Sequence, residues 1–430
     1  MKIIKVGEGG FPTIGKALSH VKEIRKNANA AGSPTASSTA CCDQSVARNK
    51  EESIDHADKD MSPTACYGQS GDIYAIEPVE IHIAPGIYHE HLDITEPYIT
   101  LVGAGADQTV ITGNLGGYEI LEDGLKRGTF RTQTVFVHTH DFTARDLTIE
   151  NAAGPGHIVG QAIALYADGD RICFENVHLK GLQDTLFTGP LPAKEVEPGG
   201  FRGPLEHAPR INGRQYYHNC TIEGSIDFIF GSATAYFKEC TLVSRDEYRD
   251  ELVTSHRDAQ VSPEETTSRR DAQVSPEETT SRRDTQVLTE ETVTSRRSTT
   301  STSNETPNQN IPPIRSYVTA ASTPEGQKYG YVFADCTFTS DCPAESCYLG
   351  RPWREYAKVV LIRCKIGPHI KPEGWHDWGK EKSHDTALFA EYESCYEGRE
   401  VDVERGMRRH LSSDEISEYE IEKVMQFCEQ

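Results

Sequence analysis

A short strand pattern that recurs along the chain constrains the fold more than any other feature of the sequence. Six four-residue segments read polar, apolar, polar, apolar, which is the pattern of a strand with one buried face. They are Asp146–Ile149, Asn176–Leu179, Asn219–Ile222, Glu239–Leu242, Asp335–Phe338 and Arg363–Ile366. No helix-length periodic segment separates them, which argues against a fold that alternates strands with helices. One strand pattern repeated every few tens of residues predicts stacked coils, so we expect an all-β parallel β-helix.

Four cysteines occupy the second position of this pattern, namely Cys220, Cys240, Cys336 and Cys364. Their shared register predicts a ladder of side chains that face the interior, where free cysteine is common. Neighbouring coils lie about 4.8 Å apart, which is close enough for some disulfides. We expect reduced thiols instead, because nothing in the chain indicates an oxidising compartment.

Short terminal helices and three insertions complete the organisation of one domain over residues 1–430. Residues about 13–26 have the apolar spacing of a helix, with Thr13 as its cap. Insertions are expected at about 27–75, 189–210 and 246–314. The first and last are polar and predicted to be disordered, and the last repeats RDAQVSPEETTSR without a change. So few apolar residues cannot bury a core, although such a segment could also tether a partner.

The charge of the chain excludes several classes of partner. A formal net charge of -22 argues against binding to nucleic acid or to an anionic membrane surface. The sequence that follows Met1 has no apolar stretch of signal-peptide length, and no later run is long enough to span a bilayer. We therefore expect a cytoplasmic protein, and we expect it to be a monomer.

Two aspartates are the residues most expected to carry chemistry. Gln161 and Gln183 are 22 positions apart, which in a solenoid with coils of roughly 20–25 residues places them on one face of adjacent coils. Without the insertion at 189–210, Asp184 and Asp227 are also about one coil apart and would face each other. Either aspartate alone would be interpreted as a turn residue. Two nearby carboxylates in different surroundings, however, can divide the roles of acid and nucleophile.

The segment Leu349–Trp353 adds a guanidinium and an indole to this set. Arg351 could hold a carboxylate ionised and oriented through a bidentate pair, and Trp353 offers a flat face to a sugar ring. A surface ion pair and a packing tryptophan are the alternative. That alternative is weakened by Gly350 and Pro352, because they impose an unusual local backbone.

These motifs resemble those of the pectin methylesterase family. The resemblance covers nearly all of the chain outside the three insertions. Its blocks are Val6–Ile14, Gly86–Glu90, Gly128–Thr134, Ala144–Asp146 with Glu150–Asn151, Gln161–Leu165, Gln183–Leu186, Asp227–Gly231 and Leu349–Trp353. The segment Leu411–Met425 resembles the C-terminal helix of the family, and Ser412 with Glu415 predicts a capping box at its start.

The resemblance implies a single-stranded, right-handed parallel β-helix that hydrolyses galacturonate methyl esters in pectin or methylated oligogalacturonides and releases methanol. Asp227 would be the nucleophile, and Asp184 would be the general acid and then the general base. Gln161 and Gln183 would donate hydrogen bonds to the oxyanion. Arg351 would orient the nucleophile.

The same resemblance implies that Trp353, Thr134 and Phe228 contact the sugar, and it implies neither cofactor nor metal. A methylated polyuronate also carries less negative charge than the free acid, which suits an acidic chain. The insertion at 189–210 borders the expected cleft and leaves the preferred length of substrate open.

Three other functions remain as alternatives: an acyl-thioester hydrolase on the same fold, a pectate lyase on a similar helix, and a non-catalytic β-helix that binds carbohydrate. His138 and His140 do not predict a metal site, because alternate residues of a strand face opposite sides. Trp375 and Trp378 are expected to pack in the core or at the rim, with sugar contact as the alternative.

Overall fold

The computed structural model describes residues 1–31, 76–249, 313–401 and 406–427. The compact unit formed by Met1–Glu247 and Ile314–Gln430 contains every helix and strand discussed below. Most of the two insertions predicted at 27–75 and 246–314 lies outside the described residues, so their expected disorder stays a prediction.

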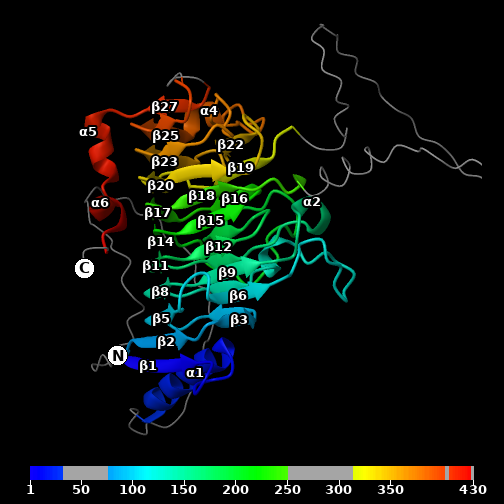
Figure 1. Ribbon diagram of the computed structural model, residues 1–430, viewed down its shortest axis with the longest axis vertical. Coiled ribbons are helices and arrows are strands. Elements are labelled where there is room, and N and C mark those ends of the chain that lie inside the picture. Colours follow the sequence, from blue (N-terminus) through cyan, green and yellow to red (C-terminus); the bar gives the residue numbers. More distant parts are fainter. Residues whose placement is uncertain (32–75, 250–312, 402–405, 428–430) are drawn as a thin grey trace, which may run out of the picture. The chain divides into compact units, whose positions relative to one another are not determined.

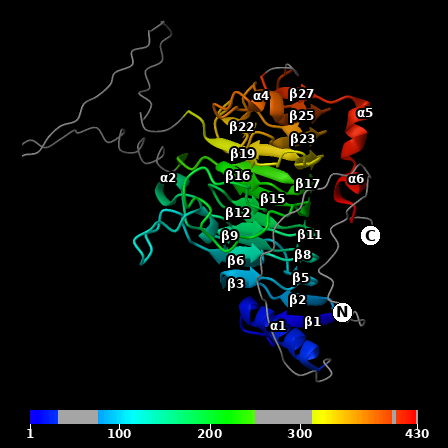
Figure 2. The same ribbon diagram turned by 180° about the vertical axis from the view of Figure 1, so that it is seen from behind.

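Three parallel sheets wind into a β-helix, as Figures 1 and 2 show from opposite sides. Sheet A comprises β1 (Lys2–Val6), β2 (Val79–Ile83), β5 (Ile99–Val102), β8 (Phe142–Arg145), β11 (Ile172–Glu175), β14 (Arg214–His218), β17 (Thr234–Lys238), β20 (Tyr331–Ala334), β23 (Lys358–Ile362), β25 (Leu388–Tyr392) and β27 (Arg408–His410). Sheet B comprises β3 (Gly86–His89), β6 (Thr109–Gly113), β9 (Thr148–Asn151), β12 (His178–Lys180), β15 (Thr221–Gly224), β18 (Thr241–Ser244), β21 (Thr337–Ser340), β24 (Lys365–Ile366) and β26 (Cys395–Tyr396). Sheet C comprises β4 (Leu92–Ile94), β7 (Val135–Val137), β10 (Leu165–Ala167), β13 (Leu186–Thr188), β16 (Ile226–Gly231), β19 (Ser316–Ala321) and β22 (Cys347–Gly350). The predicted parallel β-helix is confirmed.

The first, polar residue of each repeat forms the turn from sheet A to sheet B. All six have a positive φ of 50–58°, a conformation that Asn and Asp adopt more readily than most residues. Side chains at this position also bond between coils, since Asn219 donates to Asn176 (2.7 Å) and Asn176 donates to Asp146 (2.9 Å). The sheet B strands therefore begin two residues later than the sequence pattern suggested.

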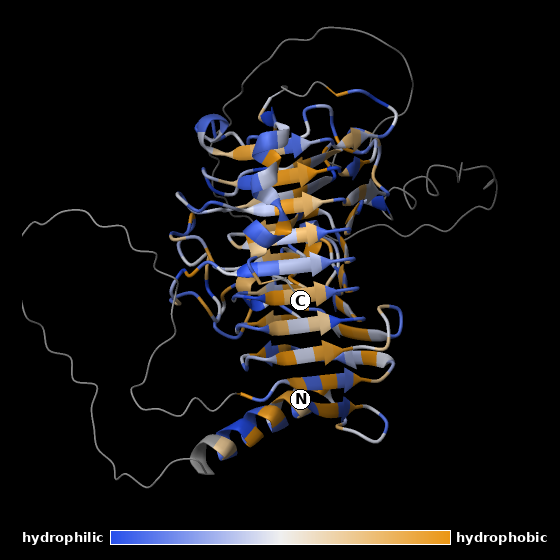
Figure 3. Cartoon of the chain, turned by 90° about the vertical axis from the view of Figure 1, so that its left-hand side faces the viewer, coloured by the Kyte–Doolittle hydropathy of each residue, from blue (hydrophilic) through white to orange (hydrophobic). Residues whose placement is uncertain are grey.

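The cysteine ladder is buried, as predicted. Cys220, Cys240, Cys336 and Cys364 are at most 1% exposed, and all four are free thiols. Each Sγ donates to a main-chain carbonyl oxygen in an adjacent coil at 3.3–3.5 Å. The thiols thus behave as small core side chains. Figure 3 shows that hydrophobic residues are frequent along the stacked strands.

Four aromatic rings form a second ladder in the core. Phe174, Tyr217, Phe237 and Phe333 lie in register on adjacent strands of sheet A. Their centroids are 5.1, 4.6 and 4.5 Å apart, and the ring planes are within 12° of parallel. All four are fully buried, so this stack ties four consecutive coils together.

Phe237→Ala should lower the free energy of unfolding by about 3–5 kcal/mol, because it removes a ring with neighbours on both sides and leaves a cavity. Urea denaturation followed by circular dichroism measures the change. Phe237→Leu leaves a smaller cavity and should cost less. An alanine variant within about 1 kcal/mol of the parent would show that the stack contributes little.

Helices lie at both ends of the chain. The N-terminal helix α1 (Ile14–Ala31) begins as expected, with the Thr13 hydroxyl accepting from the Lys16 amide at 3.2 Å. It extends beyond the predicted boundary at residue 26, so the first insertion begins later than expected. The remaining short helices are η1 (Thr129–Arg131), α2 (Gly156–Val159) and α4 (Ser383–Thr386).

The C-terminal segment packs on the outer face of sheet A through residues such as Val424 and Met425. The predicted capping box is confirmed, since Ser412 and Glu415 exchange both hydrogen bonds. The single helix predicted there is instead three short pieces: α5 (Ser413–Ile416), η2 (Ser417–Tyr419) and α6 (Ile421–Met425). No helix within the described ranges is both long and apolar enough to cross a membrane.

Candidate active site

Strands β13 and β16 of sheet C bring Asp184 and Asp227 together. The strands are parallel neighbours, with Leu186 opposite Ile229. The Asp184 amide donates to the Ile226 carbonyl oxygen at 3.0 Å. Both aspartates have positive φ values, 66° and 51°. Aspartate adopts this left-handed backbone more readily than most residues, so both side chains stand at turns where their strands begin.

A β-bulge decides which side chains around Asp227 face outward. The register of β16 against β19 shifts between Ile226 and Ile229. An extra residue breaks the simple alternation of faces. As a result, Phe228 and Ile229 both lie in the solenoid core, whereas Asp227 and Phe230 line a pocket on the outside. The predicted sugar contact of Phe228 is therefore wrong, and Phe230 occupies the pocket in its place.

Arg351 clamps Asp227 with two hydrogen bonds. Its Nε donates to one carboxylate oxygen at 2.8 Å and its Nη2 to the other at 2.7 Å. The guanidinium lies between two aromatic rings, 3.9 Å from the centroid of Tyr317 and 3.7 Å from that of Trp378. A planar cation held on both faces has few alternative orientations, so the carboxylate is fixed as well.

The two aspartates differ in their electrostatic surroundings. Each is only 8% exposed. Burial raises the pKa of Asp184 well above its ordinary value, and the neighbouring Asp227 raises it further. Burial also raises the pKa of Asp227, but the Arg351 guanidinium opposes that effect. Asp227 is therefore the carboxylate that ionises more readily of the two.

Gln161 and Gln183 lie on consecutive coils and both line the same pocket. The coils are joined by a hydrogen bond from the Ala162 amide to the Gln183 carbonyl oxygen at 3.0 Å. Gly156 packs so closely on the Gln183 side chain that a β-carbon there would collide with it. This packing restricts the Gln183 side chain within the pocket that it shares with the two aspartates.

Glu247 links the segment that packs on Gln183 to the strand that carries Asp227. Its buried carboxylate accepts from the Ser225 hydroxyl at 2.8 Å and from the Gly156 amide at 3.1 Å. Ser225 directly precedes β16, and Gly156 begins the short helix beside Gln183. One carboxylate therefore connects both sides of the site.

The pocket has a volume of 280 Å³ and contains all five residues predicted to be catalytic, together with Trp353. The residues that line it are Thr129, Phe130, Gln161, Gln183, Asp184, Val196, Glu197, Gly200, Phe201, Asp227, Phe230, Ala320, Arg351, Trp353, Arg354 and Trp378. Trp378 thus has the rim position that the sequence left open, whereas Trp375 is buried and stacks on Phe389 at 4.4 Å.

Thr134 does not reach this pocket. Its side chain is fully buried, and the hydroxyl donates to the Glu150 carbonyl oxygen at 2.7 Å. The sequence-based expectation of a sugar contact is therefore wrong. Thr129 and Phe130, from the same motif, line the pocket instead because they belong to η1, which precedes the strand.

The insertion at 189–210 forms one wall of the pocket, as its position in the sequence suggested. Phe201 packs edge-on against Phe130 at 5.8 Å and against Trp353 at 6.3 Å. Arg210 fixes the segment by donating at 2.6–3.3 Å to the carbonyl oxygens of Pro192, Leu205, Glu206 and Ala208. The insertion is a folded part of the site, and the sequence offered no motif that would reveal its pocket residues.

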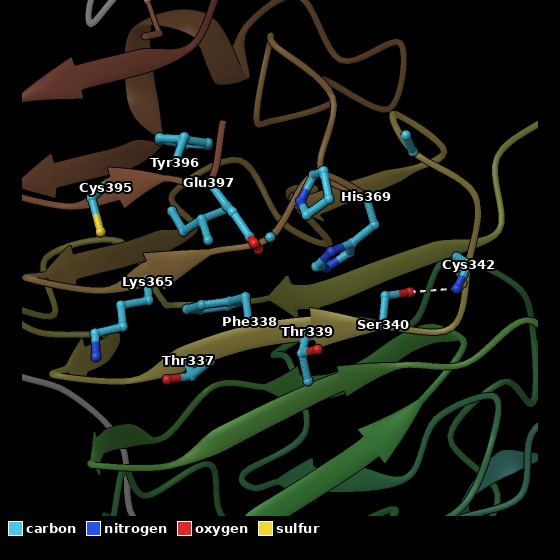
Figure 4. Close-up of a pocket in the computed structure, with 14 residues that line it drawn as sticks. Thr337, Phe338, Thr339, Ser340, Cys342, Lys365, His369, Cys395, Tyr396 and Glu397 are labelled. Carbon is cyan, nitrogen blue, oxygen red and sulfur yellow. Dashed lines mark hydrogen bonds between the residues drawn. The ribbon is translucent and has the colours of Figure 1, made fainter. Parts of the chain in front are cut away.

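A larger hollow of 550 Å³ lies over β21, β24 and β26 of sheet B (Figure 4). It is lined by hydroxyls, by Lys365 and Glu397, and by His369, and the Ser340 hydroxyl there accepts from the Cys342 amide at 2.7 Å. Burial and the nearby Arg399 lower the pKa of His369 to about 4, so its ring is neutral at neutral pH. Among the residues that the structure describes, Glu397 is the only acidic side chain that lines this hollow, so the smaller pocket is the stronger candidate for the active site.

The two histidines that follow β7, His138 and His140, do not converge. His138 Nδ1 lies 3.2 Å from the Asp168 carbonyl oxygen, whereas His140 Nδ1 lies 2.5 Å from the Asp141 carboxylate. Within the part of the chain that the structure describes, no three His, Cys, Asp or Glu side chains are grouped to hold a metal ion.

Fold and site together define a class, that of β-helical carboxylic ester hydrolases. The family model described as Pectinesterase matches residues 73–190, 210–289 and 300–427. The chain belongs to the pectinesterase family. The family model does not match the residues between 190 and 210. These residues belong to the insertion that forms one wall of the pocket, so that wall is an addition to the family pattern.

Individual relatives agree with this assignment. The chain is 27% identical over 347 residues to Pectinesterase 31 of Arabidopsis thaliana, covering 79% of this chain and 80% of the relative. It is 28% identical to a pectinesterase of Petunia integrifolia, covering 76% of this chain and 65% of that protein. A pectin methylesterase crystallised with a hexasaccharide has a TM-score of 0.59 at 23% identity, with 99% and 98% of the two chains covered. Pectin methylesterase PemA from Erwinia chrysanthemi has a TM-score of 0.54 at 25% identity, with 82% and 89% covered.

Proposed function

We propose that this chain hydrolyses galacturonate methyl esters in pectin or methylated oligogalacturonides, with Asp227 as the nucleophile and Asp184 as the general acid and base. The observation that carries the proposal is the pair of buried carboxylates, of which only Asp227 is clamped by Arg351. An ionised nucleophile beside a protonated acid is the arrangement that an acyl transfer from a poor leaving group requires.

In the first half of the reaction, an Asp227 oxygen attacks the ester carbonyl carbon. The tetrahedral intermediate carries negative charge on the former carbonyl oxygen. Gln161 and Gln183, which line the same pocket, donate hydrogen bonds to it in this proposal. The bond from carbon to the methoxy oxygen then breaks. Asp184 gives its proton to that oxygen, methanol leaves, and a mixed anhydride joins Asp227 to the sugar.

In the second half, the now ionised Asp184 takes a proton from a water molecule. The resulting hydroxide attacks the acyl carbon of the sugar, and Asp227 leaves as a carboxylate. Asp184 is again protonated, and the galacturonic acid loses its proton to solvent. Ester and water are thereby converted to methanol, galacturonate and a proton, with both aspartates restored.

An acyl-thioester hydrolase on the same fold would keep both carboxylates but would need an apolar channel for the acyl chain. The pocket favours a sugar ring, because its volume is only 280 Å³ and charged or amide groups share its walls with Trp353. A binding protein without catalysis has no need for two carboxylates in one buried site, where they repel each other.

Purified protein should release methanol from methyl-esterified pectin and oligogalacturonides and should leave a long-chain acyl-CoA intact. Methanol is measured by alcohol oxidase coupling, and thiol release is measured on the same preparation. Asp227→Asn, purified in parallel, controls for contaminating esterase. Thioester cleavage without methanol release would contradict the proposal and favour the rival hydrolase.

A further inference from the structure

Two free thiols, Cys342 and Cys347, lie in the turn that joins β21 to β22 and at its end. Cys342 is half-buried and lines the hollow of sheet B that Figure 4 shows. Cys347 is the first residue of β22 and is fully buried. A reagent that enters the hollow can therefore reach the first thiol of the pair but not the second.

Contacts around Ser244, the last residue of β18, bring the two side chains together. The Cys342 thiol donates to the Ser244 carbonyl oxygen at 3.6 Å. Cys347 is the register partner of Ser316, whose hydroxyl donates to that of Ser244 at 3.0 Å. The thiols of Cys342 and Cys347 also share a hydrogen bond. Sulfurs that are already in contact need little movement to form a bond.

The shared hydrogen bond separates the pKa values of the two thiols. It lowers the pKa of Cys347 the most, three serine hydroxyls lower that pKa further, and burial opposes them. One of these hydroxyls, that of Ser346, lies 3.7 Å from the Cys347 sulfur. The same hydrogen bond and burial raise the pKa of Cys342. The pair thus loses its first proton readily, and the proton that remains can move along the hydrogen bond, so either sulfur can act as the thiolate nucleophile.

Other thiols of the chain have different surroundings. The four cysteines of the core ladder are at most 1% exposed and do not line the hollow. Cys395 is exposed and lines the hollow from β26, but it lies at the opposite end from Cys342 (Figure 4). It is therefore an accessible thiol that is distant from the pair, which makes it a suitable comparison.

We propose that Cys342 and Cys347 are a redox modification site, which reacts with a small disulfide and closes as an internal disulfide at the start of β22. The Cys342 thiolate attacks one sulfur of the small disulfide and releases a first small thiolate. The Cys347 thiolate then attacks the Cys342 sulfur, the mixed disulfide breaks, and a second small thiolate leaves. The two protons of the pair pass to these two thiolates. The dithiol loses two electrons, and the small disulfide gains them.

The disulfide has a structural consequence that is independent of the proposed function. It closes a ring in the chain next to β22, the strand that ends immediately before Arg351. A cross-link of this kind reduces the freedom of the unfolded chain and so stabilises the folded one. Neither cysteine lines the pocket of the two aspartates, so methanol release should be equal in the two redox states.

The test incubates the folded, full-length protein with glutathione disulfide, blocks the remaining thiols with N-ethylmaleimide and maps the peptides by mass spectrometry. The peptides of Cys342 and Cys347 should be linked, and dithiothreitol should release them. The oxidised protein should melt about 3 °C higher than the reduced one. Cys347→Ser should stop at a glutathione adduct on Cys342, because the second attack is lost. Cys395→Ser is the matched control and should form the same link as wild type.

The peptide map of the wild-type protein decides the matter even if the Cys347 variant does not fold. A stable glutathione adduct on Cys342 in the wild type, an unmodified Cys342, or a link from Cys342 to another cysteine would overturn the proposal. Equal melting temperatures of the linked and the reduced protein would overturn its stabilising role. A chain that forms the link but releases no methanol would contradict the proposed function and leave the redox site intact.

Discussion

Asp227→Asn is expected to lower kcat for methanol release by at least ~10³-fold, as removal of a nucleophile does in other enzymes. The amide keeps the size of the side chain but is far too weak a nucleophile to form an anhydride with the sugar. It also removes the negative charge to which Arg351 donates two hydrogen bonds. Alcohol oxidase coupling on methylated oligogalacturonides measures the loss.

Asp168→Asn is the matched control for this change. Asp168 is also a buried aspartate at the end of a sheet C strand, and burial raises its pKa to about 6, but it does not line the pocket. Its variant should retain methanol release. An Asp227→Asn enzyme with more than a tenth of normal turnover would remove Asp227 from the mechanism.

Asp184→Asn should reduce kcat on methyl esters by about 10²- to 10⁴-fold, because methoxide then leaves without a proton and water is attacked without a base. The loss should be largest for poor leaving groups. The kcat/KM values, which report the acylation step, are compared on a methyl ester and on an aryl ester of galacturonate, whose leaving group needs no proton. Equal losses of kcat/KM on both esters would contradict a role for Asp184 as general acid.

Stability supplies an independent check on Asp184. Its pKa is raised in the folded protein, so the stability it contributes is present below the ordinary pKa of an aspartate and is lost as pH rises through the raised value. The asparagine variant has no such loss. Its melting temperature should therefore match that of wild type in acid and exceed it at neutral pH, which also excludes misfolding as the cause of low activity.

The sequence predicted the parts of the fold that depend on period and register. The buried cysteines and the stacked coils follow from a repeat in which one apolar position always faces inward, as Cys220 and Cys240 illustrate. Strand starts were misplaced because the pattern cannot tell a left-handed turn residue, such as Asn219, from the first residue of a strand.

The residues proposed to be catalytic were easier to bring together from the sequence than the residues proposed to face the sugar. Asp184, Asp227 and Arg351 stand in short motifs, and the structure brings them into one pocket. The errors at Phe228 and Thr134 have a local cause, since alternation along a strand fails at a bulge and beside a short helix. Residues of the insertion carry no motif, so only packing reveals them. The cytoplasmic location and monomeric state rest on sequence alone and stay predictions.

The covalent step through Asp227 is the central claim, and an aryl ester of galacturonate tests it most directly. With Asp184→Asn, the aryl group leaves without help from an acid, whereas hydrolysis of the anhydride lacks its base. Rapid mixing should therefore give a burst of about one equivalent of aryl alcohol per enzyme, followed by slow turnover. Mass spectrometry of the quenched enzyme should place the galacturonyl group on Asp227. Linear release without a burst, or an adduct on another residue, would contradict the account.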